Sequence, residues 1–527
     1  MKKINNVLCT KSFLSVFTVL SLISAILFRA SRSNWVFISK TVGIESFSVI
    51  LLALMAFTTG IFGVLLAIRL YDRKNEELFS KKYYKVLIII STVFAVLLFI
   101  FSLIYSIGLA VSESAEVFAF NLRKTLSEGI LMILVPFFAL YFPKVSCKTK
   151  KIILSIVLVT IAVFGLNSFY PLKPFKITSV PIIIDNGKEY SVVFSTNDYA
   201  TAYVEYTYNG KAYKLFDNTG GRLNSDSKIH SVAVPYEHLR NNTYTVGSTR
   251  VIEEFSYGSR RGKTVTSSEY RFNYNDNDEQ TWLVISDWHT ELYKAYSAIK
   301  KLNTDYDAVI LLGDASPGVD FEEQVITNTI EFAGEISEGT KPVLYVRGNH
   351  ETRGSYANKL PVALGLEQLY YTADIRPYSF VVLDSGEDKD DSHIEYGGMN
   401  DYNTYRSDMI EWLSAVEVQN EKVIALSHSW EISSVEEDLS AAGWAELDRL
   451  GTRLLLSGHE HKCRFIGDTE DKEKYLKEKY PGIIGYVDGG KIGKSYVASL
   501  LTLSKEGFKI RAVDNNGEEL LNEKFRW

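Results

Sequence analysis

Cysteine is scarce in this sequence. Three of its 527 residues are cysteines, and only Cys463 lies after residue 147. The part of the chain after residue 147 therefore has no second cysteine with which to form a disulfide within itself. The length exceeds that of one ordinary domain several times over, so we expect two or three structural units.

A basic excess is missing from the larger part of the chain. Residues 1–176 hold 20 Lys and Arg against 7 Asp and Glu, a net charge of +13, whereas residues 177–527 hold 37 against 56, a net charge of −19. Proteins that bind nucleic acids neutralise phosphates with basic side chains. The acidic part has no such surplus, so we expect no nucleic-acid-binding surface on it.

Long apolar runs occur only before residue 171. Five stretches approach or exceed the roughly 20 apolar residues that a helix needs to cross a bilayer. The first could instead be a cleaved signal peptide, but Phe28 stands where such a site needs a small residue, which favours a retained helix. We therefore predict a membrane domain over residues 1–176, with the lipid bilayer as its partner and transmembrane helices near residues 12–28, 43–71, 85–110, 126–142 and 152–170.

The positive charges between these stretches predict an orientation. With the N-terminus inside, the cytoplasmic segments hold 13 Lys and Arg and the two outside loops hold 5, as the positive-inside rule requires. Five crossings place everything after residue 170 outside. We predict a multi-pass protein of the cell membrane with an extracellular C-terminal region, and the abundance of Lys, Ile and Asn suits a bacterial source.

Two further regions differ in pattern. Residues 177–276 contain short β-prone runs separated by turn residues, including a hairpin signal at Asn209-Gly210, which indicates a β-sandwich. Residues 277–527 alternate between apolar strands, near 282–286, 308–312, 343–346, 380–383, 423–426 and 453–456, and helices near 291–302, 320–335 and 405–418. The predicted fold class is therefore multi-domain, with an α-helical transmembrane bundle, a β-sandwich and a layered α/β domain.

Five short polar motifs each follow one of these apolar strands. Each motif alone is weak, because Gly-Asp, for example, is usually only a turn. Together they predict a two-metal site, since carboxylate and imidazole groups suit Mn²⁺, Fe or Zn²⁺, and paired ions generate a nucleophile that can attack a phosphate ester. The motifs are Asp287-Trp288-His289, Gly313-Asp314, Gly348-Asn349-His350-Glu351, Ser427-His428 and Gly458-His459-Glu460-His461.

This order of motifs, over residues 282–463, closely resembles the calcineurin-like metallophosphoesterase superfamily. The resemblance implies a four-layer fold of two sheets between helices. It also implies a general acid, His350, which would protonate the leaving oxygen. Two divalent metal ions are implied as cofactors, one held by Asp287, His289 and His461, the other by Asn349, His428 and His459, with Asp314 bridging.

The upstream β-rich region resembles the fibronectin-III-like N-terminal module of purple acid phosphatases, through residues 203–206 and 242–244. The tyrosine ligand of the purple enzymes is replaced by Pro317, so no purple Fe(III) site is expected. Arg347 resembles a phosphate-binding arginine of serine/threonine phosphatases, with a surface cation as the alternative. Trp288 is expected either to line the substrate pocket or to pack against the sheet.

The predicted activity is that of a hydrolase acting on phosphate esters. A membrane-anchored binuclear-metal phosphoesterase would hydrolyse an extracytoplasmic ester by metal-hydroxide attack. The alternative is a non-catalytic membrane sensor or scaffold that binds a phosphorylated ligand through the same fold. The predicted domains are residues 1–176, the sandwich at 177–276 and the phosphoesterase domain at 277–527.

Overall fold

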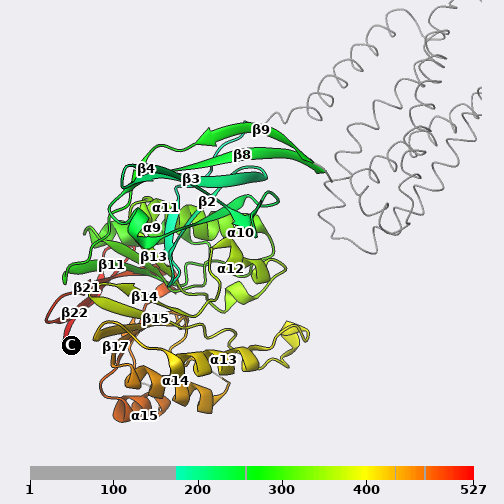
Figure 1. Ribbon diagram of the computed structural model, residues 1–527. Coiled ribbons are helices and arrows are strands. Elements are labelled where there is room, and N and C mark those ends of the chain that lie inside the picture. Colours follow the sequence, from blue (N-terminus) through cyan, green and yellow to red (C-terminus); the bar gives the residue numbers. More distant parts are fainter. Residues whose placement is uncertain (1–173, 256–257, 434, 468–470) are drawn as a thin grey trace, which may run out of the picture. The chain divides into compact units, whose positions relative to one another are not determined.

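The computed structural model describes residues 174–255, 258–433, 435–467 and 471–527 (Figure 1). In this part of the chain, residues 175–254 and 258–527 form one compact unit. The unit contains a ten-stranded sheet, a six-stranded sheet and a five-stranded sheet.

The ten-stranded sheet has a parallel centre made of β11 (Gln280–Ile285), β12 (Ala308–Leu311) and β13 (Pro342–Tyr345). These runs are apolar and almost fully buried, as strands covered on both faces must be. Beyond β11 the sheet continues through β21 (Ser495–Leu503), β22 (Gly507–Asp514) and β23 (Glu519–Arg526), and β20 (Gly490–Ile492) pairs with β21. Beyond β13 it continues through β1 (Ile182–Asp185), β2 (Tyr190–Ser195) and β7 (Ile229–Val234).

Helices connect the parallel strands of this sheet. The helix α9 (Leu292–Leu302) joins β11 to β12 and packs against β21 and β22. The next connection consists of α10 (Glu322–Val325), a π-helical segment (Ile326–Glu331) and α11 (Phe332–Ser337). The helices predicted near 291–302 and 320–335 therefore lie within one or two residues of their expected positions.

The six-stranded sheet has the order β14 (Tyr371–Ile375), β15 (Tyr378–Val382), β16 (Lys422–Leu426), β17 (Thr452–Ser457), β19 (Ile484–Val487) and β18 (Arg464–Phe465). Its helices are α13 (Tyr402–Ala415), α14 (Glu437–Arg449) and α15 (Asp471–Lys479), and the short α12 (Leu360–Ala363) precedes the sheet.

The two large sheets pack face to face. The Trp282 ring of β11 lies 4.6 Å from the Phe380 ring of β15, measured between centroids. Alternate residues of β16 then face different cores: Ile424 joins the core shared with Trp282, while Val423 joins a second core that contains Trp444 of α14. Because alternate residues of a strand point to opposite faces, each sheet packs against the other sheet on one face and against helices on the other face. The layers are therefore helix, sheet, sheet and helix.

The β-rich region is not a separate sandwich, and this corrects the predicted fold class. Its strand β1 pairs in parallel with β13, with Ile183 opposite Pro342 and Ile184 opposite Val343, so β1, β2 and β7 extend the sheet of the α/β domain. All four residues of β1 are buried, and this apolar strand needs cover on both faces. The five-stranded sheet is formed by β3 (Ala200–Tyr208), β4 (Lys211–Phe216), β8 (Thr243–Phe255), β9 (Gly258–Thr266) and β10 (Tyr270–Arg271).

The predicted hairpin at Asn209-Gly210 is present between β3 and β4, where both turn residues have positive φ. The short elements of the same region are β5 (Asn218–Thr219), β6 (Arg222–Leu223) and α8 (Tyr236–Leu239).

The predicted transmembrane bundle is a second correction to the fold class. None of the helices in the described residues is long and apolar enough to cross a membrane. The longest α-helix of the described residues, α13, has 14 residues and so spans about 21 Å, short of the roughly 30 Å hydrocarbon core. The five predicted spans fall at residues 12–170, outside the described residues, and the observed fold is α/β.

Candidate metal centre

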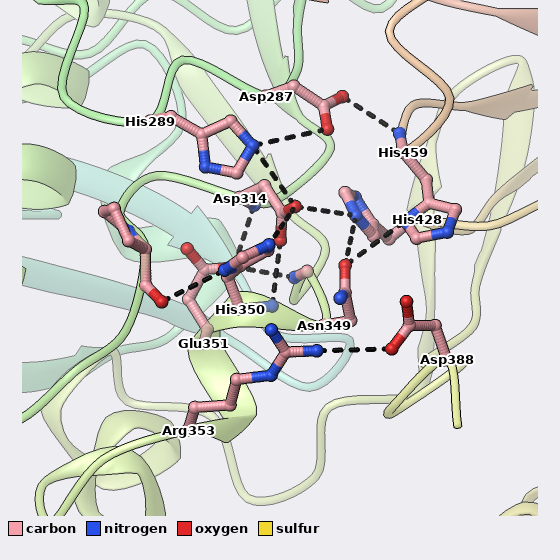
Figure 2. A network of polar contacts seen from close by, with 12 residues as sticks. Asp287, His289, Asp314, Asn349, His350, Glu351, Arg353, Asp388, His428 and His459 are labelled. Atoms are coloured by element: carbon pink, nitrogen blue, oxygen red, sulfur yellow. Dashed lines mark hydrogen bonds and ion pairs between the residues drawn. The ribbon is translucent and has the colours of Figure 1, made fainter. Parts of the chain in front are cut away.

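The predicted site residues come together at one edge of the two large sheets (Figure 2). Three polar loops follow the parallel strands β11, β12 and β13, and two follow β16 and β17 of the other sheet. Parallel strands end at the same edge, so the loops that follow them converge. The structure thereby gathers all eight predicted residues: Asp287, His289, Asp314, Asn349, His350, His428, His459 and His461.

One group of possible ligands surrounds Asp287. The Asp287 Oδ1 atom lies 4.0 Å from His289 Nε2 and 3.8 Å from His461 Nε2. These three side chains offer ligand atoms that all lie within 4.8 Å of one another. They are the three residues predicted to share one ion.

A second group surrounds Asp314 and Asn349. The Asp314 Oδ2 atom lies 3.3 Å from His428 Nε2, and Asn349 Oδ1 lies 3.2 Å from both His428 Nε2 and His459 Nδ1. Asp314 Oδ2 also lies 3.5 Å from His289 Nε2 of the first group. One carboxylate oxygen therefore faces an imidazole of each group.

A bound cation accounts for two polar features of this arrangement. Asp287 Oδ1 is buried and has no hydrogen-bond partner, although a buried carboxylate oxygen without one is costly. The Asn349 amide presents its oxygen to His428, His459 and Asp314, whereas its NH₂ group could donate to all three if the amide were turned over. A shared cation explains both features, because it needs several electron-pair donors at one point. The residues therefore fit divalent metal ions.

The protonation states of the histidines also suit metal binding. Burial lowers the pKa of His289 and of His459 to about 4, so both rings are neutral at pH 7 and carry a free electron pair. Burial would also lower the pKa of His428, but the negative charges of Asp314 and Asp287 outweigh it and raise that pKa to about 10. Without a metal ion, the proton on His428 therefore lies beside Asp314, at the position where the donor set favours a metal ion.

The ligand loops are held in unusual backbone conformations. Asp287, His289, Asp314, His459 and His461 all have positive φ angles, between 38° and 71°. Such conformations are uncommon outside glycine and cluster at functional sites. At Gly348, a Cβ atom would lie 2.1 Å from Asp314 Oδ1, so only glycine permits the approach of these two loops.

A comparison with protein families identifies the domain. Residues 281–463 match the family model described as calcineurin-like phosphoesterase. This part of the chain is a calcineurin-like phosphoesterase domain. The predicted resemblance over residues 282–463 is confirmed, and so is the reaction class: the chain is a phosphate-ester hydrolase. The matched residues do not include 177–276, and the resemblance of that region to the purple acid phosphatase module is not confirmed.

The chain shows similarity to several solved structures of other proteins. The structure of PhoD has 13% identity and a TM-score of 0.40, and covers 67% of this chain and 90% of that one. GAP50, the anchor in the inner membrane complex of Plasmodium, has 13% identity, a TM-score of 0.33 and coverages of 47% and 89%. A cold-active protein-tyrosine phosphatase of Shewanella has 11% identity, a TM-score of 0.25 and coverages of 67% and 100%. No curated protein matches the sequence.

Glu351 is a residue of the phosphoesterase domain whose role the sequence does not reveal. Its buried carboxylate accepts hydrogen bonds from the backbone N–H groups of Asp314 (2.8 Å), Ala315 (2.5 Å) and Gly348 (2.9 Å). Burial and the charge of Asp314 raise the pKa of Glu351 to about 7. Glu351 therefore ties the Asp314 loop to the Asn349 loop, and its place in the Gly-Asn-His-Glu motif is the only signal in the sequence.

The His350 ring lies beside the two groups of possible ligands, and it has a hydrogen-bond partner in the backbone. Its Nδ1 atom lies 3.0 Å from the Pro317 carbonyl oxygen. Since a carbonyl oxygen only accepts, Nδ1 must carry the hydrogen. Its Nε2 atom then faces the centre, 3.9 Å from Asp314 Oδ2, and the side chain is 29% exposed. The Pro317 carbonyl thus orients the His350 ring.

Two other residues of the motifs take structural positions. Arg347 is buried and pairs with Asp384 at 2.7 Å, so it is neither a surface cation nor available to a phosphate. Trp288 is fully buried, donates its indole N–H to the Asn328 carbonyl and packs on Phe332. It therefore belongs to the core and not to a substrate pocket.

Proposed function

We propose that the domain hydrolyses a phosphate ester at two divalent metal ions. The observation that supports this most strongly is the position of Asp314, whose Oδ2 atom lies within 3.5 Å of an imidazole nitrogen of each group. When bound, the ions would supply an acidified water as nucleophile and positive charge for the phosphoryl oxygens. We assign the ligands as Asp287, His289 and His461 for one ion, Asn349, His428 and His459 for the other, and Asp314 shared between them.

Backbone carbonyls orient two of the histidines in this proposal. His428 donates from Nδ1 to the Leu312 carbonyl at 2.5 Å, and His461 donates from Nδ1 to the Lys491 carbonyl at 2.6 Å. Each bond fixes the tautomer that leaves Nε2 with its electron pair directed at the centre. The chain therefore presents these donors without the need for a rotation.

We assign the proton transfer to His350. The ring is held by Pro317 through Nδ1 and presents Nε2 at the open side of the centre. In its protonated form it would donate the Nε2 proton to the ester oxygen that leaves, while water adds to phosphorus on the opposite side.

The test is hydrolysis by the purified full-length chain before and after removal of metal. The substrates are p-nitrophenyl phosphate and methyl p-nitrophenyl phosphate, each with Mn²⁺, Zn²⁺ or Fe²⁺ restored after chelation. We expect at least one ester to be hydrolysed, and chelation to abolish the reaction reversibly. Inactivity on both esters with every metal would contradict the proposal and favour a protein that only binds a phosphorylated ligand. A location outside the cytoplasm stays a prediction of the sequence, since the residues that carry it are not described.

A further inference from the structure

The loop between β15 and α13 is attached to the metal centre by an arginine. Arg353 lies three residues after His350, and its guanidinium binds both carboxylate oxygens of Glu387, at 2.8 and 2.7 Å. Glu387 is buried and also accepts a hydrogen bond from Tyr396 at 2.8 Å. The loop therefore has a fixed position at the site, and its next residue, Asp388, is placed with it.

Asp388 lies beside Arg353, at the edge of the network of polar contacts around the centre (Figure 2). Its Oδ1 atom is 3.2 Å from Arg353 Nη2, and 30% of its side chain is exposed. The same Nη2 atom lies 3.2 Å from the amide of Asn349, a predicted ligand. A substrate phosphate at the metal ions therefore lies within the field of this carboxylate.

The cations around the centre already have acidic partners. Every Lys and Arg of the described residues that stands within five positions of a predicted site residue is paired with a carboxylate. These cations are Lys294 with Glu291, Arg347 with Asp384, Arg353 with Glu387 and Asp388, Lys462 with Glu460, and Arg464 with Glu460 and Glu473. Lys491, whose backbone carbonyl contacts the His461 ring, pairs with Glu291 at 3.3 Å. The protein thus provides little positive charge for a phosphate beyond that of the metal ions.

The number of charges on the substrate decides how much this matters. A phosphomonoester has a second pKa near 6 and carries close to two negative charges above pH 7. A phosphodiester carries only one. Arg353 stands between two carboxylates, so the side chains of Arg353, Glu387 and Asp388 together carry a net charge of −1. Repulsion from this cluster is therefore larger for the monoester.

We propose that the site is a phosphodiesterase site and that Asp388 is a specificity-determining residue, which disfavours phosphomonoesters through its charge. This inference rests on the proposed function. In the reaction, water adds its oxygen to phosphorus, one P–O ester bond breaks, and the leaving oxygen takes a proton from His350. The proton that the water releases returns His350 to its protonated form. The products are a phosphomonoester and an alcohol.

The experiment compares two esters with the same leaving group at pH 8. Methyl p-nitrophenyl phosphate is the diester and p-nitrophenyl phosphate is the monoester, both assayed with the Mn²⁺-loaded full-length chain. We expect kcat/KM of the wild-type protein to be at least about tenfold higher for the diester. In Asp388→Asn, kcat/KM for the monoester should rise about 3- to 30-fold relative to the diester, as expected for removal of one nearby charge.

A matched control is Glu395→Gln. Glu395 is an exposed acid of the same loop, but it pairs with Lys389, so its loss should leave the ratio of the two kcat/KM values unchanged. Asp388→Ser removes the same charge with a smaller side chain and should reproduce the effect if Asp388→Asn does not fold. A wild-type preference for the monoester, or an unchanged ratio in a folded Asp388 variant, would overturn the inference. Inactivity on both esters would instead contradict the proposed function.

Discussion

Two pairs of a buried histidine and a buried aspartate differ in what surrounds them. His428 Nε2 lies 3.3 Å from Asp314 Oδ2 at the metal centre, and His230 Nδ1 lies 3.8 Å from Asp217 Oδ2 in the β-rich region. Asp217 accepts hydrogen bonds from Asn224 and from the Ser231 backbone, and His230 Nε2 contacts the Thr196 hydroxyl at 2.8 Å. The second pair is satisfied by protein groups.

The difference shows what marks a metal centre. Both histidines are almost completely buried, so burial beside a carboxylate does not distinguish them. At the centre, further ring nitrogens and carboxylate oxygens converge on the pair, and Asp287 Oδ1 has no hydrogen-bond partner. At His230, burial lowers the pKa to about 3, and the ring is a neutral part of the core. Convergent donors that do not satisfy one another are therefore the feature that indicates a cation.

The sharpest way to break this comparison is to remove each aspartate. Asp314→Ala should lose both metal ions, because Asp314 is shared by the two groups, and activity should fall by more than the roughly 10- to 100-fold that loss of a supporting partner costs. Asp217→Ala should keep two ions per chain. Elemental analysis of the purified proteins gives the measurement. Retention of one ion in Asp314→Ala would contradict the shared position of this residue.

A second test separates chemistry from metal binding at His350. His350→Ala should keep its metal ions, since the ligand set is complete without this ring. The value of kcat should fall about 10²- to 10⁴-fold for an alkyl ester, whose leaving oxygen needs a proton. It should fall much less for a p-nitrophenyl ester of the same class, measured in parallel. Equal losses for the two esters would contradict the role of His350 as general acid, and loss of metal would show that it is a ligand.

A smaller effect is expected from Glu351. In Glu351→Gln, an NH₂ group would face backbone N–H groups that now donate to a carboxylate. The Asp314 and Asn349 loops should separate slightly, and metal affinity should fall about 10- to 100-fold, as for other partners that orient ligands. Competition with a metal-binding dye measures the affinity. An unchanged affinity would mean that the glycine contacts alone hold these loops.

The convergence of these residues could be predicted from the sequence because each predicted ligand follows an apolar strand. The strands β11, β12, β13, β16 and β17 all lie within two residues of the predicted ranges. Apolar runs bounded by turn residues are local signals, and parallel strands bring their ends together whatever the order of the sheet. The motifs therefore contained enough information to gather the eight residues.

Long-range pairing could not be predicted in the same way. β1 joins β13 across about 160 residues, and nothing local in its four residues names that partner. Likewise, no motif in the sequence indicates that Arg353 pairs with Glu387. The predicted strand ranges do not include β21, β22 and β23, which form one side of the large sheet. In each case the partner is decided by burial in three dimensions and not by the periodicity of the segment.

The smallest expected effect concerns stability and pH at His230. Its folded pKa of about 3 lies below the ordinary value of 6.5, so between these values the unfolded chain binds more protons than the folded one. The free energy of unfolding should therefore fall as the pH falls through this window, by up to about 1.4 kcal/mol per pH unit.

His230→Gln cannot bind this proton. With a chelator present to remove the contribution of the metal centre, urea unfolding of both proteins between pH 7 and pH 4 should show the wild-type protein losing stability relative to the variant. Asp217 contributes its own pH dependence to both proteins and largely cancels in the difference. Parallel curves would mean that His230 gains a proton in the folded state and resembles His428 more closely than its surroundings indicate.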